Sequence, residues 1–166
     1  MNTRIQVEHP VTEMITGVDL VKEQIRIAAG EPISFSQEEV KLSGHAIECR
    51  INAESAETGF RPCPGKITEW LPPEGQGIRL DSHCYSGYIV PPFYDSLLGK
   101  LIARGRDRHE AIRRMKFALS EFVVSGIDTT IPFYQRILDH PDYQNGKVNT
   151  RWVEEILLQT RNETES

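Results

Sequence analysis

The clearest structural signal in the chain is the stretch Gly44-His45-Ala46-Ile47-Glu48-Cys49-Arg50-Ile51-Asn52-Ala53. Successive side chains of a β-strand point to opposite faces. One face of this stretch carries His45, Ile47, Cys49 and Ile51. The other face carries Ala46, Glu48, Arg50 and Asn52. The alternation predicts a strand with an apolar back, from which Arg50 projects between Glu48 and Asn52.

Arg50 has two interpretations on this pattern. A guanidinium on a strand face could stabilise a developing oxyanion. The alternative is a surface ion pair with Glu48, which lies two residues away on the same face. The alternation alone favours the second.

Downstream of this stretch the sequence predicts short strands first and then helices. Eleven of the 22 Gly and Pro residues fall between Gly59 and Pro92, which is typical of strands joined by tight turns. The predicted strands are Gly44–Ala53, Lys66–Leu71, Ile78–Cys84 and Leu97–Arg104. From Asp107 an apolar stripe at helical spacing predicts an amphipathic helix, and it consists of Ala111, Ile112, Met115, Ala118, Leu119 and Phe122. Shorter helices are predicted after Thr130-Ile131-Pro132 and after Asn149-Thr150.

Upstream, residues 1–43 predict a short strand followed by helical sequence. Asp19 can cap a helix whose apolar positions include Val21 and Ile25, and Gly30 ends it. Ser36-x-x-Glu39 has the form of a capping box before one more turn. With the strands and helices downstream, this makes the predicted fold class α+β.

The first residues suggest a second candidate site. In an extended segment Asn2, Arg4, Gln6 and Glu8 share one face, while Thr3, Ile5 and Val7 share a face that resembles core. An arginine fork fits a small planar anion such as bicarbonate, and a neighbouring carboxylate can serve as a general base or join a metal site. The alternative is a half-exposed strand with a polar solvent face.

Another motif, Pro91-Pro92-Phe93-Tyr94-Asp95-Ser96, is typical of a stiff aromatic turn before the last predicted strand. A turn that pins a hairpin is the favoured interpretation, and a segment flanking a pocket is the alternative.

Composition narrows the classes of function. The 166 residues carry a net charge of −5, with lysine and arginine scattered among acids, so a nucleic-acid partner is not expected. Membrane association and secretion are not expected either, because apolar runs of the needed length are missing, and cytoplasmic is the default location. Cys49, Cys63 and Cys84 lack paired spacing and are expected to be small buried residues. Phosphate-binding and nucleophile-elbow motifs are missing from the sequence.

The motifs together resemble the biotin carboxylases. The resemblance rests on residues 1–13 (MNTRIQVEHPVTE) and 17–21 (GVDLV), on 44–54 (GHAIECRINAE), on 64–67 (PGKI), on 94–102 (YDSLLGKLI) and on 126–130 (GIDTT). It extends over nearly the whole chain to about Leu158. It implies the end of an ATP-grasp domain in residues 1–43, the β-rich biotin carboxylase C-terminal domain with packed helices in 44–158, and a frayed tail in 159–166.

The resemblance also implies a reaction and roles for named residues. The family makes carboxyphosphate from bicarbonate and MgATP and then carboxylates a ureido nitrogen of biotin. Arg4, Gln6 and the Val7 backbone N–H would hold bicarbonate, and Glu8 would be the general base. Arg50 would stabilise the enolate oxygen of biotin, and Asn2 matches a residue near the metal ions. The implied cofactors are biotin on a carrier protein, ATP, and Mg²⁺ or Mn²⁺.

Family members are much longer, and the resemblance therefore implies that ATP-phosphate and main metal ligands lie upstream of Met1. This chain alone is expected to be inactive. The implied partners are a biotin carboxyl carrier protein, carboxyltransferase subunits and a second copy in a homodimer. Acetyl-CoA carboxylase, and with it fatty acid synthesis, is the default assembly, and the pyruvate, propionyl-CoA and methylcrotonyl-CoA enzymes share the module. A non-catalytic dimerisation or carrier-docking module is the competing hypothesis.

Overall fold

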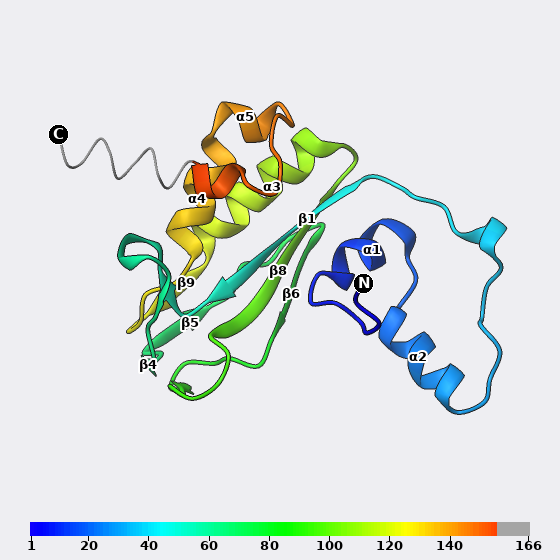
Figure 1. The fold of residues 1–166 in the computed structure, drawn as a ribbon, viewed down its shortest axis with the longest axis horizontal. Helices are drawn as coiled ribbons and strands as arrows, with labels where there is room; N and C mark the ends of the chain where they lie inside the picture. The colour runs from blue at the N-terminus through cyan, green and yellow to red at the C-terminus, as the bar shows by residue number, and fades with distance from the viewer. Residues whose placement is uncertain (156–166) are drawn as a thin grey trace.

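The computed structural model describes residues 1–155 (Figure 1). The predicted frayed tail at 159–166 and the predicted domain end at 158 lie outside these residues. In chain order the elements are α1 His9–Thr16, α2 Leu20–Ala28, the 3₁₀ turn Gln37–Glu39, β1 His45–Asn52, β2 Glu54–Ser55, the 3₁₀ turn Ala56–Thr58, β3 Arg61–Pro62, β4 Gly65–Lys66, β5 Glu69–Leu71, β6 Ile78–Ser82, β7 Ile89–Val90, β8 Leu97–Gly105, α3 Arg108–Glu121, β9 Val123–Ser125, α4 Ile131–Asp139 and α5 Pro141–Gln144.

The centre of the fold is an antiparallel sheet of three strands in the order β1-β8-β6. Its register aligns side chains in rows across the strands: Cys49 lies opposite Leu101, which lies opposite Leu80. This row belongs to the face that carries the apolar core, as the alternation in β1 predicted. Three two-stranded pairs, β2-β3, β4-β7 and β5-β9, complete the strands described.

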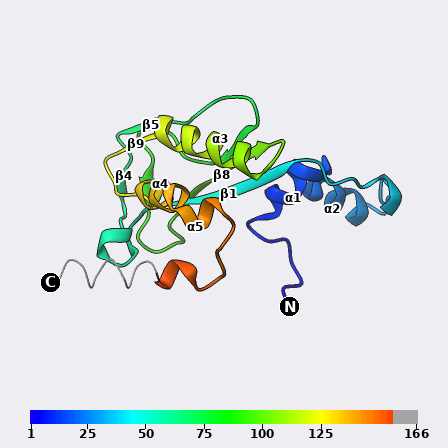
Figure 2. The ribbon, with the colours of Figure 1, turned by 90° about the horizontal axis from the view of Figure 1, so that it is seen from above.

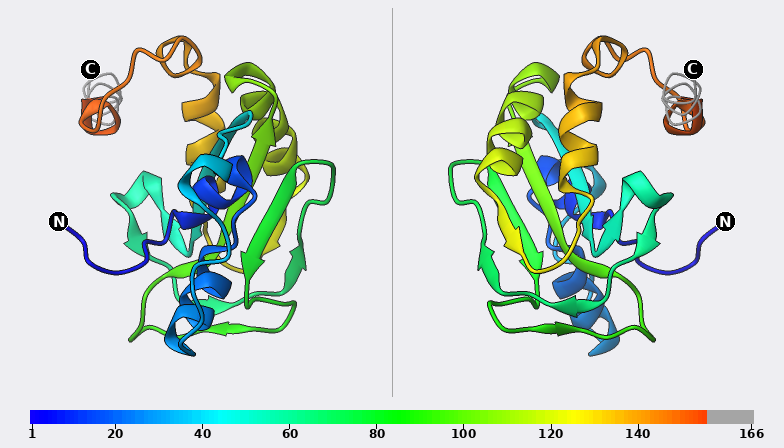
Figure 3. Two further views of the ribbon diagram at one scale, coloured as in Figure 1. Left: turned by 90° about the vertical axis from the view of Figure 1, so that its right-hand side faces the viewer. Right: turned by 90° about the vertical axis from the view of Figure 1, so that its left-hand side faces the viewer.

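Helix α3 covers the apolar face of the sheet. All six residues of its predicted stripe are buried, and they pack into one cluster with β1 and β8. Asp107 caps the helix by accepting the Glu110 backbone N–H at 2.8 Å. Figure 3 shows α4, in orange, beside α3, in yellow-green, so both helices close the core from the same side.

The opposite face of the sheet is charged and lies under helix α1. Its residues are Glu48 and Arg50 of β1, Lys100 and Ile102 of β8, and Arg79 and Asp81 of β6, which the register brings into two rows. Ile102 is fully buried. Helices α1 and α2 lie at the end of the molecule away from β4 and β5 (Figure 2).

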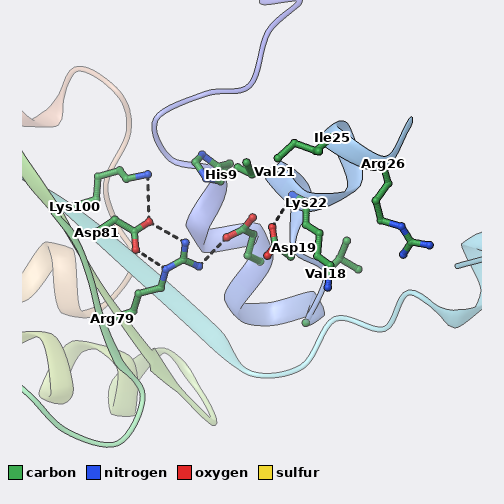
Figure 4. A pocket seen from close by; sticks show the side chains of 12 residues that line it. His9, Val18, Asp19, Val21, Lys22, Ile25, Arg26, Arg79, Asp81 and Lys100 are labelled. Atoms are coloured by element: carbon green, nitrogen blue, oxygen red, sulfur yellow. Dashed lines mark hydrogen bonds and ion pairs between the residues drawn. The ribbon is translucent and has the colours of Figure 1, made fainter. Parts of the chain in front are cut away.

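One buried carboxylate ties α1 to this face. Glu13 is 8% exposed and accepts a hydrogen bond from Arg79 Nη1 at 2.7 Å. Its other oxygen accepts the backbone N–H of Leu20, the first residue of α2, at 2.8 Å. Arg79 also forks onto Asp81, which Lys100 approaches at 3.4 Å (Figure 4). Glu13 therefore fixes both N-terminal helices relative to the sheet.

Several predicted elements are confirmed at their positions. The strands predicted at 44–53, 78–84 and 97–104 correspond to β1, β6 and β8. Helix α2 begins after Asp19, whose side chain accepts the Lys22 N–H at 2.8 Å. The capping box of Ser36 and Glu39 is present, and residues 152–155 are helical as predicted after Asn149-Thr150.

Two predictions about local structure are wrong. Residues 1–8 form no strand; they run as an open segment away from α1 (Figure 2), because no strand of the described chain lies alongside to pair with them. The strand predicted at 66–71 is divided into β4 and β5, which pair with different partners, β7 and β9. The sequence pattern made no prediction about burial in α2, whose apolar positions are exposed, with Val21 at 43% and Ile25 at 66%.

The cysteine prediction holds in part. All three thiols are free, and Cys49 is buried in the core, but Cys63 and Cys84 are only half-buried. Burial raises the pKa of the Cys84 thiol. No helix within residues 1–155 is long and apolar enough to cross a membrane.

We predict that Glu13→Gln lowers the free energy of unfolding by about 1–3 kcal/mol, because it leaves the Arg79 guanidinium without its charged partner on α1. Urea unfolding followed by circular dichroism measures the change. The matched control is Glu57→Gln, at an exposed carboxylate, which should shift stability by less than about 0.5 kcal/mol. Equal stability of the two variants would show that the ion pair contributes nothing to the packing of α1.

Candidate active site

Two segments 42 residues apart in the sequence meet at one ion pair. Arg50 Nη2 donates to Glu8 Oε2 at 2.7 Å, and both side chains are about half exposed. Glu8 is the residue that immediately precedes helix α1, and Arg50 lies near the end of β1. The pair therefore stands at the junction between the N-terminal helices and the sheet.

The backbone of β1 is anchored at this point. The strand register shifts between Ile51 and Asn52, and the Thr130 hydroxyl occupies the irregularity. It donates to the Arg50 carbonyl at 3.0 Å and accepts the Asn52 N–H at 3.1 Å. Thr130 is 3% exposed and precedes α4. A buried contact from the core side thus fixes the backbone that carries Arg50.

A cavity of about 360 Å³ opens beside the ion pair. Arg50 and Val7 line it from one side, and Tyr94, Asp95 and Ser96 line it from the segment before β8. The aromatic turn at 91–96 thus flanks a pocket, the alternative to the favoured interpretation from sequence. Tyr94 is 81% exposed and forms part of the cavity lip.

The electrostatics of Glu8 suit a carboxylate that stays ionised. A hydrogen bond from its own backbone N–H lowers the pKa of Glu8, and the hydrogen bond from Arg50 lowers it further. Arg4 adds a small attraction of the same sign. Glu8 is therefore available at neutral pH as a proton acceptor that is accessible to solvent.

Glu48 has the opposite character. Both of its carboxylate oxygens are shielded from solvent, and within the described residues neither has a hydrogen-bond partner. Burial raises the pKa of Glu48 to about 7, against the opposing pull of Lys100 and Arg50. The interpretation that the alternation favoured, a surface ion pair between Arg50 and Glu48, is therefore wrong, since Arg50 pairs with Glu8.

The other residues singled out near the N-terminus are less closely gathered. Asn2 and Arg4 are exposed, and Arg4 Nη1 donates to the Ile5 carbonyl at 3.3 Å. Gln6 is half-buried, and its backbone carbonyl oxygen lies 2.6 Å from His9 Nδ1. Val7, assigned to the core face by alternation, instead lines the cavity with Arg50. The two side-chain faces expected of a strand therefore do not form, because the segment before α1 ends in a turn and contains no strand.

The sequence pattern missed two features of this site. Thr130 sits 80 residues from Arg50, and its hydroxyl contact gives no local signal. Glu48 was recognised only as a potential partner of Arg50, because burial of its oxygens is a tertiary effect that strand spacing does not predict. The aromatic turn was the one signal that could have located the cavity.

Comparison with protein families matches the two parts of the chain separately. Residues 48–155 match the biotin carboxylase C-terminal domain. Residues 1–36 match the ATP binding domain of the carbamoyl-phosphate synthase L chain.

Among curated proteins, a biotin carboxylase from Nostoc sp. is 60% identical over 94% of this chain and 35% of its own length. A pyruvate carboxylase component from Methanothermobacter thermautotrophicus is 57% identical over 93% of this chain and 32% of its own length. The chain thus spans about a third of the length of these relatives.

Solved structures of biotin carboxylases are also similar to this chain. The biotin carboxylase domain of a thermophilic 2-oxoglutarate carboxylase, bound to bicarbonate, superposes with a TM-score of 0.91 at 51% identity, covering 93% of this chain and 35% of that one. A Campylobacter jejuni biotin carboxylase in a β-γ-ATP complex superposes with a TM-score of 0.89 at 47% identity. The match covers 93% of this chain and 34% of that one. With the α+β architecture and both family matches, these findings place the chain in the biotin carboxylase family.

Proposed function

We propose that this chain is the part of an ATP-dependent biotin carboxylase that handles bicarbonate and biotin. The Glu8–Arg50 ion pair beside an open cavity carries the proposal, because it joins an ionised carboxylate and a guanidinium at one accessible point. The relatives support it: one is described with bicarbonate bound and another with a nucleotide. The division at residues 43 and 44, between an ATP-grasp remnant and the C-terminal domain, is part of the same proposal.

In the first step Glu8 acts as the general base. It takes the hydroxyl proton of bicarbonate while a bicarbonate oxygen attacks the γ-phosphorus of ATP; the bond to ADP breaks and carboxyphosphate forms. Arg4, Gln6 and the Val7 backbone N–H hold the bicarbonate. Arg4 and Glu8 are both exposed, and Val7 lines the cavity, so these three residues are accessible to a small anion.

In the second step Arg50 stabilises negative charge on the substrate. Carboxyphosphate releases CO₂, its phosphate takes the ureido proton, and the nitrogen of carrier-bound biotin bonds to CO₂. Arg50 then donates to the ureido oxygen while that oxygen carries charge. The fixed backbone of β1 at Thr130 limits how far this donor can move.

The metal that the family uses fits this chain only in part. No group of three or more His, Cys, Asp or Glu residues within 1–155 could hold a metal ion. Asn2 is exposed and offers one amide oxygen, a ligand that Mg²⁺ or Mn²⁺ accepts. A bound Mg²⁺ would neutralise phosphate charge in the first step, and Asn2 would supply at most one of its ligands.

The finer assignment covers assembly and location. We assign the chain to an acetyl-CoA carboxylase of fatty acid synthesis in the cytoplasm, with a biotin carboxyl carrier protein, carboxyltransferase subunits and a second copy as partners. The 60% identity to a protein named biotin carboxylase supports this assignment. The pyruvate carboxylase relative with 57% identity makes a pyruvate-dependent assembly the alternative. Carboxylation of acetyl-CoA or of pyruvate by the reconstituted complex separates the two.

The Arg50 role is tested in a chimaera in which this chain replaces the matching third of the Nostoc sp. biotin carboxylase, so that an ATP-binding part is supplied. Arg50→Gln should lower kcat/KM for biotin by about 10²–10³-fold, because a donor to the developing oxyanion is removed. Phosphate release coupled to biotin carboxylation measures the effect.

The matched control for this experiment is Arg113→Gln, at an exposed arginine of α3, which should leave turnover unchanged. Sedimentation of both variants is measured in parallel. Lost assembly with normal turnover in Arg50→Gln would contradict the catalytic role and favour the dimerisation or carrier-docking module.

The chain alone should not hydrolyse ATP in the presence of biotin and bicarbonate, because its sequence contains no glycine-rich phosphate loop with its lysine. A phosphate-release assay on the purified 166-residue chain measures this, with the chimaera as the positive control. Sustained biotin-dependent hydrolysis by the chain alone would overturn the prediction.

A further inference from the structure

The carboxyl group of Glu48 has no role in the reaction proposed above, yet it lies next to the residues that perform it. Both oxygens are shielded from solvent and have no hydrogen-bond partner within residues 1–155. A buried carboxylate without a partner is costly, and native proteins retain such groups rarely. The position of Glu48 therefore calls for a specific explanation.

The two cations nearest to Glu48 are both engaged elsewhere. Arg50 binds Glu8 at 2.7 Å, and Lys100, which lies opposite Arg50 in the sheet, approaches Asp81 at 3.4 Å. From helix α1, Glu13 is held by Arg79 of β6. The charged groups on the elements packed against this sheet face are Glu8, His9, Glu13, Arg50, Arg79, Asp81 and Lys100.

Arg50 is within reach of Glu48 by strand geometry. Residues two apart on one strand face are separated by roughly 7 Å, which is comparable with the length of an arginine side chain. Arg50 therefore stands between two carboxyl groups: Glu8, which it binds, and Glu48, which it does not. Rotation about the side-chain bonds of Arg50 is the movement that would exchange one carboxyl group for the other.

We propose that Glu48 is a positioning residue for Arg50, the second carboxyl group to which this guanidinium turns when Glu8 carries a proton. The inference rests on the proposed function. When Glu8 accepts the bicarbonate proton, the Glu8–Arg50 pair loses its charge attraction. Glu48 then gives its own proton to water and becomes the counter-charge that keeps Arg50 at the cavity for the second step.

The direction of the electrostatics agrees with this exchange. Burial holds the pKa of Glu48 near 7, and the negative charge of Glu8 contributes to the rise. Neutralising Glu8 removes that contribution, so the pKa of Glu48 falls and its ionised fraction at neutral pH rises. The charge states of the two carboxyl groups are thus coupled, with Arg50 beside both.

The first test follows the carboxyl groups of the 166-residue chain by NMR with ¹³C-labelled glutamate, with Glu48→Gln used to assign the Glu48 signal. Glu48 should titrate near pH 7 in the parent chain and at lower pH in Glu8→Gln. In Arg50→Gln it should titrate at higher pH, because a cation is lost. Glu57→Gln, the exposed control, should leave the midpoint unchanged. A Glu48 midpoint that does not move in Glu8→Gln would overturn the proposal.

The second test measures the pH profile of biotin carboxylation in the chimaera. The parent should show an inflection near pH 7 that Glu48→Gln removes with an approximately tenfold loss of kcat, while the KM for bicarbonate stays constant. Glu48→Asp should restore the inflection. An unchanged profile in Glu48→Gln would overturn the proposal. Inactivity of the parent chimaera would instead refute the proposed function, and the NMR titration, which needs no turnover, would still decide the role of Glu48.

Discussion

The ion pair between Glu13 and Arg79 is the interaction on which the arrangement of the site depends. It is mostly buried, it joins α1 to the charged face of the sheet, and the same carboxylate holds the first turn of α2. Glu8 directly precedes α1. The contact of Glu8 with Arg50 is therefore set by an interaction one and a half helical turns away, and the site depends on how two parts of the chain dock.

Sequence patterns predicted the parts of this fold whose causes are local or strictly periodic. The alternation in β1 and the stripe of α3 are periodic burial patterns, and Asp19, Asp107 and Ser36 act through hydrogen bonds to nearby N–H groups. The failures are long-range. Residues 1–8 alternate as a strand does, but pairing requires a neighbour, and the interruption between β4 and β5 is set by partners more than 20 residues away.

The candidate site was predicted in its residue types but not in its contacts. Alternation selected Glu8 and Arg50, which the structure brings together, and also Asn2 and Arg4, which lie exposed at the start of the chain. Alternation assigned Glu48 as the partner of Arg50, because two residues on one strand face are neighbours. The partner came instead from another segment, and the burial of the Glu48 oxygens is a tertiary effect that strand spacing does not encode.

The order of the central sheet has a consequence for how this polypeptide is made. Strand β8 lies between β1 and β6, yet it is the last of the three to be synthesised. Neither outer strand can begin to pair in this sheet before residue 97 has left the ribosome, about 50 residues after the start of β1. The apolar side of β1 stays uncovered for longer still, until α3 at Arg108–Glu121 has followed β8, and chaperones have access to it in that period.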